Sequence, residues 1–229
     1  MISLSKRLMA IASLVNEDAK IADIGCDHAL LDIYLTQKYP AVEAIAIDIT
    51  TGALSQAKKN IEKYESKRIG LRLGDGLDVV ENSEIDTIII SGLGCYKILN
   101  ILFKNLDKIN NVNNLIIQSN NDYYDIRKRI CDKGFFIDTE ILIEENGIIY
   151  LIISFKKGHK KYNKKDYLFG PVLRIEKSGL FNKLLVSDLK KKEVLFSSIP
   201  RKHLIKRIYV KKQIIKMKKQ AKLNKIVTG

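Results

Sequence analysis

The residues best suited to chemistry stand at the end of a short apolar run near the N-terminus. Residues 20–24 suit a strand buried on both faces, and Gly25 ends that strand between two acids, Asp23 and Asp27. A glycine at this point lets the backbone turn sharply and lets a ligand approach the main chain closely. A second apolar run ends at Asp48, whose carboxylate could accept hydrogen bonds from two ribose hydroxyls. The pattern is typical of the ligand-binding corner of an α/β domain.

The number of glycines separates two ligands that such a corner could bind. A dinucleotide-binding turn reads G-x-G-x-x-G, and its second glycine makes room for a pyrophosphate. Here the turn reads Gly25-Cys26-Asp27-His28, without a further glycine. The carboxylates of Asp23 and Asp27 would repel a pyrophosphate but would attract an amino group and a sulfonium. The sequence therefore favours S-adenosylmethionine, and the alternative is an ordinary strand–turn–helix corner with solvated acids.

Three further segments follow later apolar runs and could complete the same site. They are GDGL at residues 74–77, SGLG at residues 91–94 and QSNN at residues 118–121. In an open α/β sheet, ligands bind outside the carboxyl ends of the strands. A carboxylate in the first segment could accept from an adenine amino group, the glycines of the second let the backbone approach the transferred group, and the amides of the third could bind a base edge. Each segment alone is commonly a plain turn, but together they indicate one site.

Alternating strands and helices are expected to position these segments. An apolar stripe that includes Leu8 and Ile11 predicts a leading helix. We expect strands at residues 20–24, 44–47, 69–73, 85–90, 114–118, 135–143 and 148–155, and helices at residues 29–38, 51–65, 96–107 and 122–133, with a short helical loop near residues 77–81. Asn146-Gly147 predicts a tight hairpin turn between the last two strands. The fold class is therefore α/β, with one mixed seven-stranded sheet.

Charge divides the chain more sharply than its net charge of +14 suggests. Residues 1–155 contain 17 Lys and Arg against 22 Asp and Glu, whereas residues 156–229 contain 23 against 4. A basic segment joined to a mildly acidic domain suggests a polyanionic partner, most simply nucleic acid. The alternative is a genome whose base composition favours Lys, Ile and Asn, but that bias does not explain why acids become scarce after residue 155.

The basic segment is expected to form an antiparallel pair of helices. After a lysine-rich connector at residues 156–165, the spacing predicts helices over about residues 172–196 and 201–226, with Pro200 at the start of the second. The seam between them would consist of Leu173, Leu180, Leu184, Val194, Leu195, Leu204, Ile208, Ile215 and Ile226. We expect two domains, residues 1–157 for the cofactor and residues 158–229 for the nucleic acid. A helical pair that only stabilises the first domain is the alternative.

Composition limits the remaining possibilities. The apolar runs are broken by charges before they reach membrane-spanning length, and the N-terminus lacks a secretory pattern, so we expect a cytoplasmic protein. The three cysteines have no paired spacing and the three histidines are scattered, so we expect neither a disulfide framework nor a metal site. We expect a monomer rather than an oligomer.

The chain resembles the bacterial TrmK family in the segments DIGCDHALL, GDGL and SGLG and in its Ser5-Lys6-Arg7-Leu8 helix start. The resemblance covers nearly the whole chain and implies a class I, Rossmann-like methyltransferase domain with a C-terminal helical hairpin. It implies transfer of a methyl group from S-adenosylmethionine to N1 of adenine 22 in tRNA, with S-adenosylhomocysteine as product. Cys95, Ser119 and Leu31-Asp32 depart from the family pattern, which usually has glycine, proline and Leu-Pro there.

These considerations give three groups of candidate residues. Candidates for the cofactor are Asp23, Gly25, Cys26, Asp27, Asp48, Ile49, Asp75, Gly76, Leu77, Ser91 and Gly92. Candidates for catalysis are Asp27 to stabilise the positive charge that develops on the adenine, Asn120 to orient the base and His28 as a later proton acceptor; the alternative for His28 is a helix-start residue that only packs. Candidates for tRNA contact are Arg7, Lys160, Lys161, Lys164, Lys165, Lys211 and Lys212. The functional alternatives are a basic RNA-binding protein with a vestigial pocket, or a methyltransferase for another nucleic acid or a small molecule.

Overall fold

The computed structural model describes residues 2–224 of the chain. The chain forms two compact units, residues 1–172 and residues 173–229. Among the described residues, the first unit holds all the strands, and the second contains helices and no strand.

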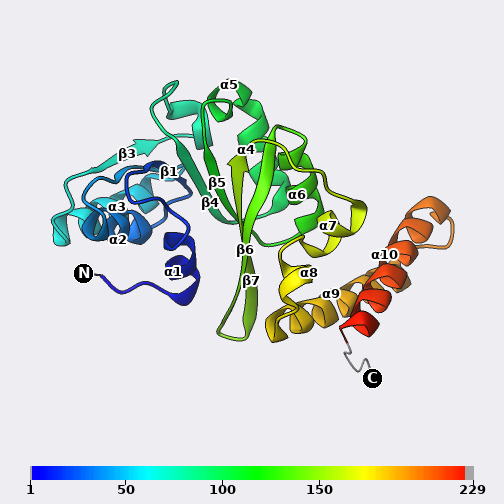
Figure 1. Ribbon diagram of the computed structural model, residues 1–229. Coiled ribbons are helices and arrows are strands. Elements are labelled where there is room, and N and C mark those ends of the chain that lie inside the picture. Colours follow the sequence, from blue (N-terminus) through cyan, green and yellow to red (C-terminus); the bar gives the residue numbers. More distant parts are fainter. Residues whose placement is uncertain (1, 225–229) are drawn as a thin grey trace. The chain divides into compact units, whose positions relative to one another are not determined.

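One seven-stranded sheet runs through the first unit (Figure 1). Its strands are β1 (Lys20–Ile24), β2 (Glu43–Asp48), β3 (Ile69–Leu73), β4 (Thr87–Leu93), β5 (Asn114–Ser119), β6 (Phe135–Glu145) and β7 (Ile148–Lys157), in the order β3-β2-β1-β4-β5-β7-β6. Strand β7 runs antiparallel to both of its neighbours, and the other pairs are parallel. The predicted mixed seven-stranded sheet is therefore confirmed. Because β1 lies between β2 and β4, the chain order reverses there, and a crevice opens at the carboxyl ends of these strands.

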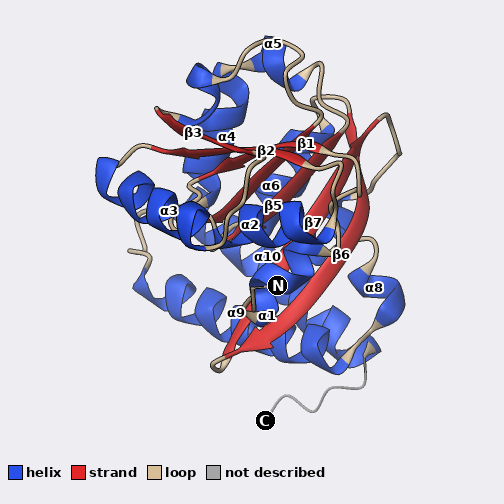
Figure 2. Cartoon of the chain, turned by 90° about the vertical axis from the view of Figure 1, so that its left-hand side faces the viewer, coloured by secondary structure: helices blue, strands red, loops and turns tan. Residues whose placement is uncertain are grey.

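Helices cover both faces of the sheet, as Figure 2 shows. One face carries α1 (Lys6–Ala12), α2 (Leu30–Lys38) and α3 (Thr51–Lys63), and the other carries α4 (Cys95–Lys104) and α6 (Tyr123–Cys131). A short helix, α5 (Leu106–Ile109), and a 3-10 turn, η1 (Gly76–Val79), complete the unit. The central strands read as apolar runs because both of their faces are buried: Ile21, Ile89 and Ile116 are at most 1% exposed and share one core with α1 and α2.

Two strands extend further than the sequence predicts. Strand β4 was expected to end at residue 90 but continues through Ser91, Gly92 and Leu93, and β5, which was expected to end at residue 118, also includes Ser119. A bulge at Gly92, where φ is +80°, lets Ser91 pair with Gln118 and Leu93 pair with Ser119. The predicted helix over residues 96–107 is also interrupted, because the backbone turns at Asn105 between α4 and α5. The Asn146-Gly147 turn is confirmed, since both residues have positive φ.

The first unit ends at Val172, fifteen residues after the expected boundary at Lys157. The connector folds back onto the first unit, with a short helix, α7 (Lys164–Phe169), capped at Asn163. Arg127 links the connector to the sheet, because it donates to the Glu140 carboxylate at 2.7 Å and to the Tyr167 carbonyl at 3.1 Å. The side chains of Arg127 and Glu140, which form an ion pair, are both buried. The sequence shows the lysines of the connector but not these long-range contacts.

The second unit contains a helical hairpin of α9 (Gly179–Ser198) and α10 (Leu204–Leu223), preceded by a single turn, α8 (Leu173–Glu176). The hairpin is antiparallel, because Asn182 contacts Asn224 near the open end and Glu193 pairs with Lys218 nearer the turn. The predicted first helix is broken at Lys177, whose φ is +49°. Pro200 does not begin the second helix: it lies in the turn, and its carbonyl accepts from the amide of His203, the residue before α10.

The hairpin seam differs from the predicted one. Leu173 and Leu184 are buried as expected and Leu180 is half-buried, whereas Val194, Leu195, Leu204, Ile208 and Ile215 are exposed, and Ile226 lies outside the described residues. The buried side chains are instead Phe181, Leu185, Leu189, Val210, Ile214 and Met217. Apolar residues occur on several faces of both helices, so periodicity alone did not identify the buried one.

Candidate functional site

A cleft of about 470 Å³ opens at the carboxyl ends of β1 to β4. The chain segments that the sequence singled out converge there, together with the start of α1 and the first turn of α4. Of the candidate residues, those that line it are Arg7, Asp23, Gly25, Cys26, Asp27, His28, Asp48, Ile49, Asp75, Gly76, Ser91 and Gly92. Four carboxylates against one arginine and one lysine give this cleft an acidic lining.

Gly25 forms the corner between β1 and α2. Its φ is +77°, a conformation that side-chain-bearing residues rarely adopt, and no other part of the protein comes within 4 Å of where a Cβ would lie. The amides of Gly25 and Cys26 both donate to the Ile47 carbonyl, at 2.8 and 3.1 Å, which ties the corner to the end of β2. The space beside Gly25 is thus open to a ligand, and a side chain there would fill it.

The residues between this corner and α2 have an unusual backbone. Asp27 and Ala29 both have positive φ, 51° and 53°. Such strain at non-glycine residues is commonly found at ligand-binding sites. No side chain caps the N-terminus of α2 in this part of the chain, so its first amides keep their capacity to donate to an anionic group.

Asp48 is held in place at the end of β2. One of its carboxylate oxygens accepts from both the amide and the hydroxyl of Thr50, each at 2.9 Å. The other oxygen accepts from the Asp27 amide at 3.4 Å, and Asp48 lines the cleft. A carboxylate fixed in this way can accept hydrogen bonds from ligand hydroxyls without first having to be ordered.

Asp23 is a buried carboxyl group at the inner wall of the cleft. It is only 6% exposed, and burial raises its pKa to about 7; a side-chain hydrogen bond with Asp32 lowers this pKa, Asp48 raises it and Arg7 lowers it. Burial also raises the pKa of the Cys26 thiol, which is therefore protonated at neutral pH and is not a nucleophile.

A hydrogen-bond network joins the bulge of β4 to β5 and α1. Gln118, which is 1% exposed, accepts from the Gly92 amide at 2.9 Å and from the Arg7 guanidinium at 3.0 Å. Arg7 also donates to the Ser91 hydroxyl at 2.9 Å. Asn120 accepts from the Gln118 amide at 3.1 Å and donates to the Gly92 carbonyl at 2.7 Å. Arg7 therefore reaches the cleft as part of a positioned network, and Asn120 is already oriented beside Gly92.

Two candidates lie elsewhere than expected. Leu77 does not line the cleft; its side chain is fully buried, and its carbonyl accepts from Lys108 at 2.6 Å. Asn120 is exposed and reaches the cleft only through Gly92, which lines it. The two polar catalytic candidates at the corner do lie together: His28 Nε2 is 3.5 Å from the Asp27 carboxylate, and both side chains are half exposed or more.

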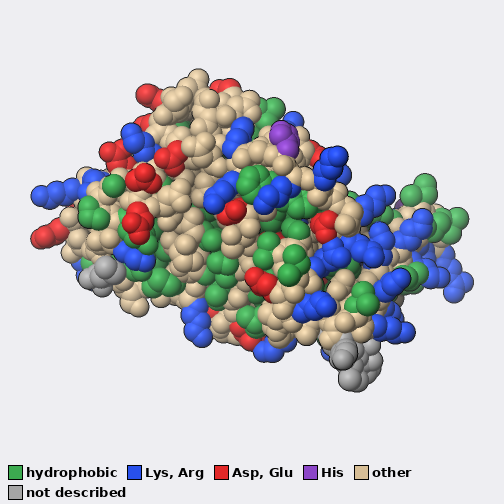
Figure 3. Space-filling view, in the orientation of Figure 1, with side chains coloured by type: hydrophobic (Ala, Val, Ile, Leu, Met, Phe, Trp, Pro, Cys, Tyr) green, Lys and Arg blue, Asp and Glu red, His purple; other side chains and the backbone are tan. Residues whose placement is uncertain are grey.

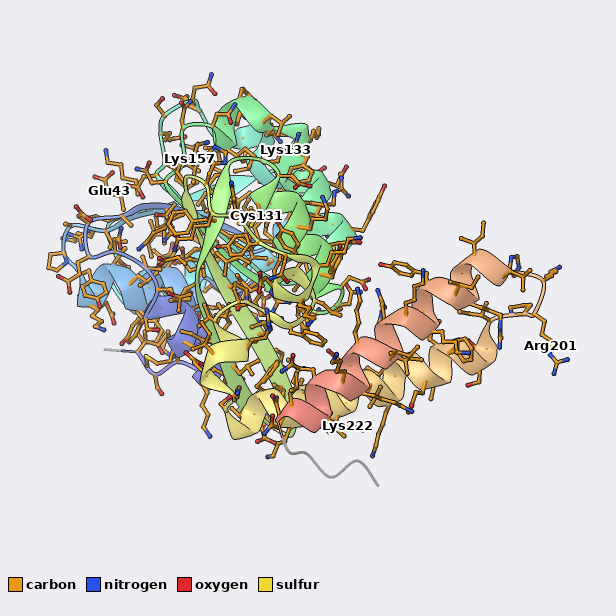
Figure 4. The ribbon with its side chains drawn as sticks, turned by 45° about the vertical axis from the view of Figure 1, so that its right-hand side comes forward. Glu43, Cys131, Lys133, Lys157, Arg201 and Lys222 are labelled. Carbon is orange, nitrogen blue, oxygen red and sulfur yellow. The ribbon has the colours of Figure 1, made fainter. Side chains whose placement is uncertain are left out.

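The lysine candidates fall into the two units of the chain. Lys160 and Lys161 lie in the connector, Lys164 and Lys165 begin α7, and Lys211 and Lys212 lie on α10; all six are exposed. Lysine and arginine side chains gather over the α9–α10 hairpin in Figure 3. They continue along the hairpin between the labelled Arg201, in its turn, and Lys222, near the end of α10, in Figure 4. The basic character of each segment is thus presented to solvent.

Some residues of the site were missed by reasoning from the sequence. Thr50 holds Asp48, and Lys97 and Ile101 of α4 line the cleft. Gln118 had been considered only as a group that binds a base edge. The position of Thr50, two residues after a candidate carboxylate, was an available signal, since such residues commonly form local hydrogen bonds. No signal in the sequence indicated the role of Gln118, because that role depends on the pairing of β4 with β5.

Within residues 2–224, no helix is long and apolar enough to cross a membrane. Over the same residues, no group of three or more His, Cys, Asp and Glu side chains is arranged to hold a metal ion.

Known proteins are similar to this chain in sequence and in structure. Residues 21–220 match the family model TrmK, described as tRNA (adenine(22)-N(1))-methyltransferase. The tRNA (adenine(22)-N(1))-methyltransferase of Bacillus subtilis is 33% identical over 205 residues, which cover 86% of each chain. A Streptococcus pneumoniae structure in complex with S-adenosyl-L-methionine is 33% identical, with a TM-score of 0.85 over 95% of this chain and 99% of that one. The structure of Mycoplasma capricolum TrmK in complex with S-adenosyl-homocysteine is 32% identical, with a TM-score of 0.82 over 94% and 96%.

Proposed function

The chain belongs to the TrmK family of tRNA (adenine(22)-N(1))-methyltransferases, and from this we propose that it transfers a methyl group from S-adenosylmethionine to N1 of adenine 22 in tRNA. The observation that carries the proposal is the acidic cleft, where Asp23, Asp27, Asp48 and Asp75 converge around one glycine corner. Such a lining suits a nucleoside whose reactive end is cationic and disfavours a pyrophosphate.

The residues of the cleft fit S-adenosylmethionine. Asp48, fixed by Thr50, would accept from the ribose hydroxyls, and Asp75 at the start of η1 would accept from the adenine amino group. The open backbone at Gly25 and the uncapped start of α2 would receive the carboxylate end of the cofactor. Asp23 would face the positively charged end of the cofactor. When bound, the cofactor supplies a methyl group activated by a sulfonium.

The protein's part in the transfer is to align the target base. Adenine N1 carries an in-plane lone pair, so no general base has to remove a proton before the methyl group is transferred. We propose that Asn120, oriented by Gly92 and Gln118, positions the base. Positive charge then develops on the adenine, and the Asp27 carboxylate and the Gly92 carbonyl would stabilise it. His28, paired with Asp27, would accept the proton that later leaves the adenine N6 group.

The target adenine must be unpaired or flipped out of its stack, because N1 is occupied in a Watson–Crick pair. Exposed lysines would hold the tRNA backbone through phosphate contacts, which give affinity without reading sequence. Residues 173–229 contain 17 Lys and Arg against 3 Asp and Glu, which supports a role for the hairpin in this step. Arg7, Lys160, Lys161, Lys164, Lys165, Lys211 and Lys212 remain the proposed contacts.

We also propose that the protein acts as a cytoplasmic monomer. Its proposed substrate is made and used in the cytoplasm, and one chain contains both the cleft and the basic hairpin. Light scattering of the purified chain with and without tRNA tests the monomer: the expected mass is that of one 26.1 kDa chain, and a mass of two chains in the absence of tRNA contradicts it.

Methyl mapping tests the proposed reaction. Unmodified tRNA is incubated with the full chain and S-adenosylmethionine, and the product is analysed by mass spectrometry of its nucleosides and by primer extension, which stops at N1-methyladenine. The expected result is a stop at position 22 alone. Absence of any methyl group, together with no calorimetric binding of S-adenosylhomocysteine at millimolar concentration, would instead identify a basic RNA-binding protein with a vestigial pocket.

A further inference from the structure

Behind the cleft, two buried carboxyl groups face each other. Asp23 of β1 lines the cleft and is 6% exposed; Asp32, in the first turn of α2, is 0% exposed and does not line it. The side chain of each group affects the pKa of the other: Asp32 lowers the pKa of Asp23, and Asp23 raises the pKa of Asp32. Two carboxyl groups can share a hydrogen bond only when one of them holds a proton, because an ionised carboxylate offers only acceptors.

The surroundings decide which of the two carries the proton. No side chain donates a hydrogen bond to either carboxylate oxygen of Asp32, and the backbone hydrogen bond that lowers its pKa is outweighed by burial, so an ionised Asp32 would be a poorly compensated buried charge. Burial and the neighbouring Asp23 both raise the pKa of Asp32 well above its usual range. Asp23, in contrast, borders the cleft and lies in the field of the Arg7 guanidinium, which favours its ionised form. The proton therefore belongs on Asp32.

We propose that Asp32 is a positioning residue of the cofactor site: as a neutral carboxylic acid it donates a hydrogen bond to the Asp23 carboxylate and directs that carboxylate toward the cleft. This inference rests on the proposed function, because it assigns Asp23 to the positively charged end of the cofactor. It accounts for a buried acid in the first turn of α2 that has no other side-chain partner among the described residues.

Cofactor binding should consequently be coupled to a proton. Without ligand, burial raises the pKa of Asp23 to about 7, so Asp23 holds its proton more firmly than an exposed carboxyl group does. Asp48 from β2 raises the pKa of Asp23, and Arg7 from α1 lowers it. The neighbouring Cys26 thiol stays neutral because burial raises its pKa. A cationic group in the cleft stabilises the ionised form of Asp23 and releases its proton.

The test is calorimetric titration of the full-length protein with S-adenosylhomocysteine, in two buffers of different ionisation enthalpy, from pH 5.5 to pH 8.5. The difference between the buffers gives the number of protons released. For the natural chain we expect partial proton release near pH 7, and a dissociation constant that rises toward tenfold for each pH unit below the pKa of Asp23. Asp32→Asn, which keeps a donor, should bind within about threefold of the natural chain at pH 8.

Asp32→Leu removes the donor and should weaken binding about tenfold at pH 7, because the pKa of Asp23 rises when its hydrogen-bond donor is lost. The matched control is Thr36→Val, one turn later on α2, which removes a buried hydroxyl that bonds only to backbone carbonyls of its own helix. This control should leave affinity and proton release unchanged. If Asp32 had only a structural role, Asp32→Leu would release the same number of protons on binding as the natural chain.

Stability gives a second readout that needs no cofactor. The pKa of Asp32 is raised in the folded state above its unfolded value of about 3.8, so the contribution of this one group to the free energy of unfolding is most favourable below pH 4 and declines as the pH rises toward the raised pKa. Asp32→Asn should therefore raise the melting temperature more at pH 8 than at pH 5. Failure of the natural chain to bind S-adenosylhomocysteine would overturn the proposed function. Normal binding, with the same affinity in Asp32→Leu and no proton release, would overturn this inference alone.

Discussion

Single residues determine what the cleft can bind, and Asp48 shows this most directly. Asp48→Ala removes a carboxylate that Thr50 holds in place, and with it two acceptors for ligand hydroxyls. Hydrogen bonds to a charged group contribute about 1.5–3 kcal/mol, so we expect the dissociation constant of S-adenosylhomocysteine to rise by roughly 10- to 100-fold. Isothermal titration calorimetry measures this. The matched control is Glu43→Gln at the opposite end of β2, where the side chain is exposed and pairs only at 3.8 Å with Lys20. Equal affinities of the two variants would contradict the assignment.

Gly25 is the second residue whose type can be tested. Gly25→Ala places a side chain at a φ of +77°, which costs about 1–2 kcal/mol in stability, and it fills the open space beside the cleft. We expect a lower melting temperature and loss of cofactor binding. Gly52→Ala is the control: Gly52 lies in α3 without a positive φ, and a Cβ there meets nothing within 4 Å. That variant should be slightly more stable, by about 0.5–1 kcal/mol, and should bind normally. Normal binding by Gly25→Ala would show that no ligand approaches the corner.

The residue scale is also where the sequence was most informative about the site. Asp23, Gly25, Asp27 and Asp48 could be assigned to one cleft because parallel strands end at the same edge of a sheet, and the structure places them there. Gln118 and Asp32 could not be assigned. Their surroundings consist of residues far away in the sequence or of a buried partner on another element, and neither leaves a local pattern.

At the scale of elements, apolar runs predicted all seven strands but not where polar residues continue them. Strand β4 extends through Ser91 and Gly92 because β5 lies beside it and pairs across the bulge. The residue types at this point are those of a turn, but pairing with the neighbouring strand makes the segment a continuation of β4. The same limit applies to the connector. It belongs to the first unit, to which Arg127 joins it, and not to the hairpin that follows it in the sequence.

The link from the connector to the sheet can be tested through the buried ion pair of Arg127 and Glu140, whose side chains are 2% and 0% exposed. Arg127→Met leaves a buried carboxylate without its main partner, so we expect a loss of about 3–5 kcal/mol in the free energy of unfolding. Urea denaturation followed by circular dichroism measures it. The adjacent exposed pair of Lys128 and Asp132 provides the control: Lys128→Met should change stability by less than about 1 kcal/mol. If both variants are equally stable, α7 is not fastened through Arg127.

At the scale of the whole molecule, the division of charge separates two tasks in one chain. The first 155 residues are mildly acidic and contain a cleft that favours a cationic ligand, whereas the rest is strongly basic. A basic cleft would compete for the phosphates of tRNA, and an acidic hairpin would repel them. Composition could not predict the unit boundary at Val172. The lysine-rich connector is basic like the second unit, but it contacts the first unit.

This separation predicts that tRNA binding and cofactor binding can be altered independently. Lys211→Gln combined with Lys212→Gln removes two exposed charges from α10, so we expect weaker tRNA binding and a slope of log affinity against log salt that is smaller by up to about two. Affinity for S-adenosylhomocysteine should not change. Lys58→Gln combined with Lys63→Gln on α3 removes the same charge from the first unit and is the matched control. Fluorescence anisotropy of labelled tRNA at several salt concentrations distinguishes the two double variants. Equal losses in both would mean that net charge alone attracts the tRNA, and that the hairpin is not its docking surface.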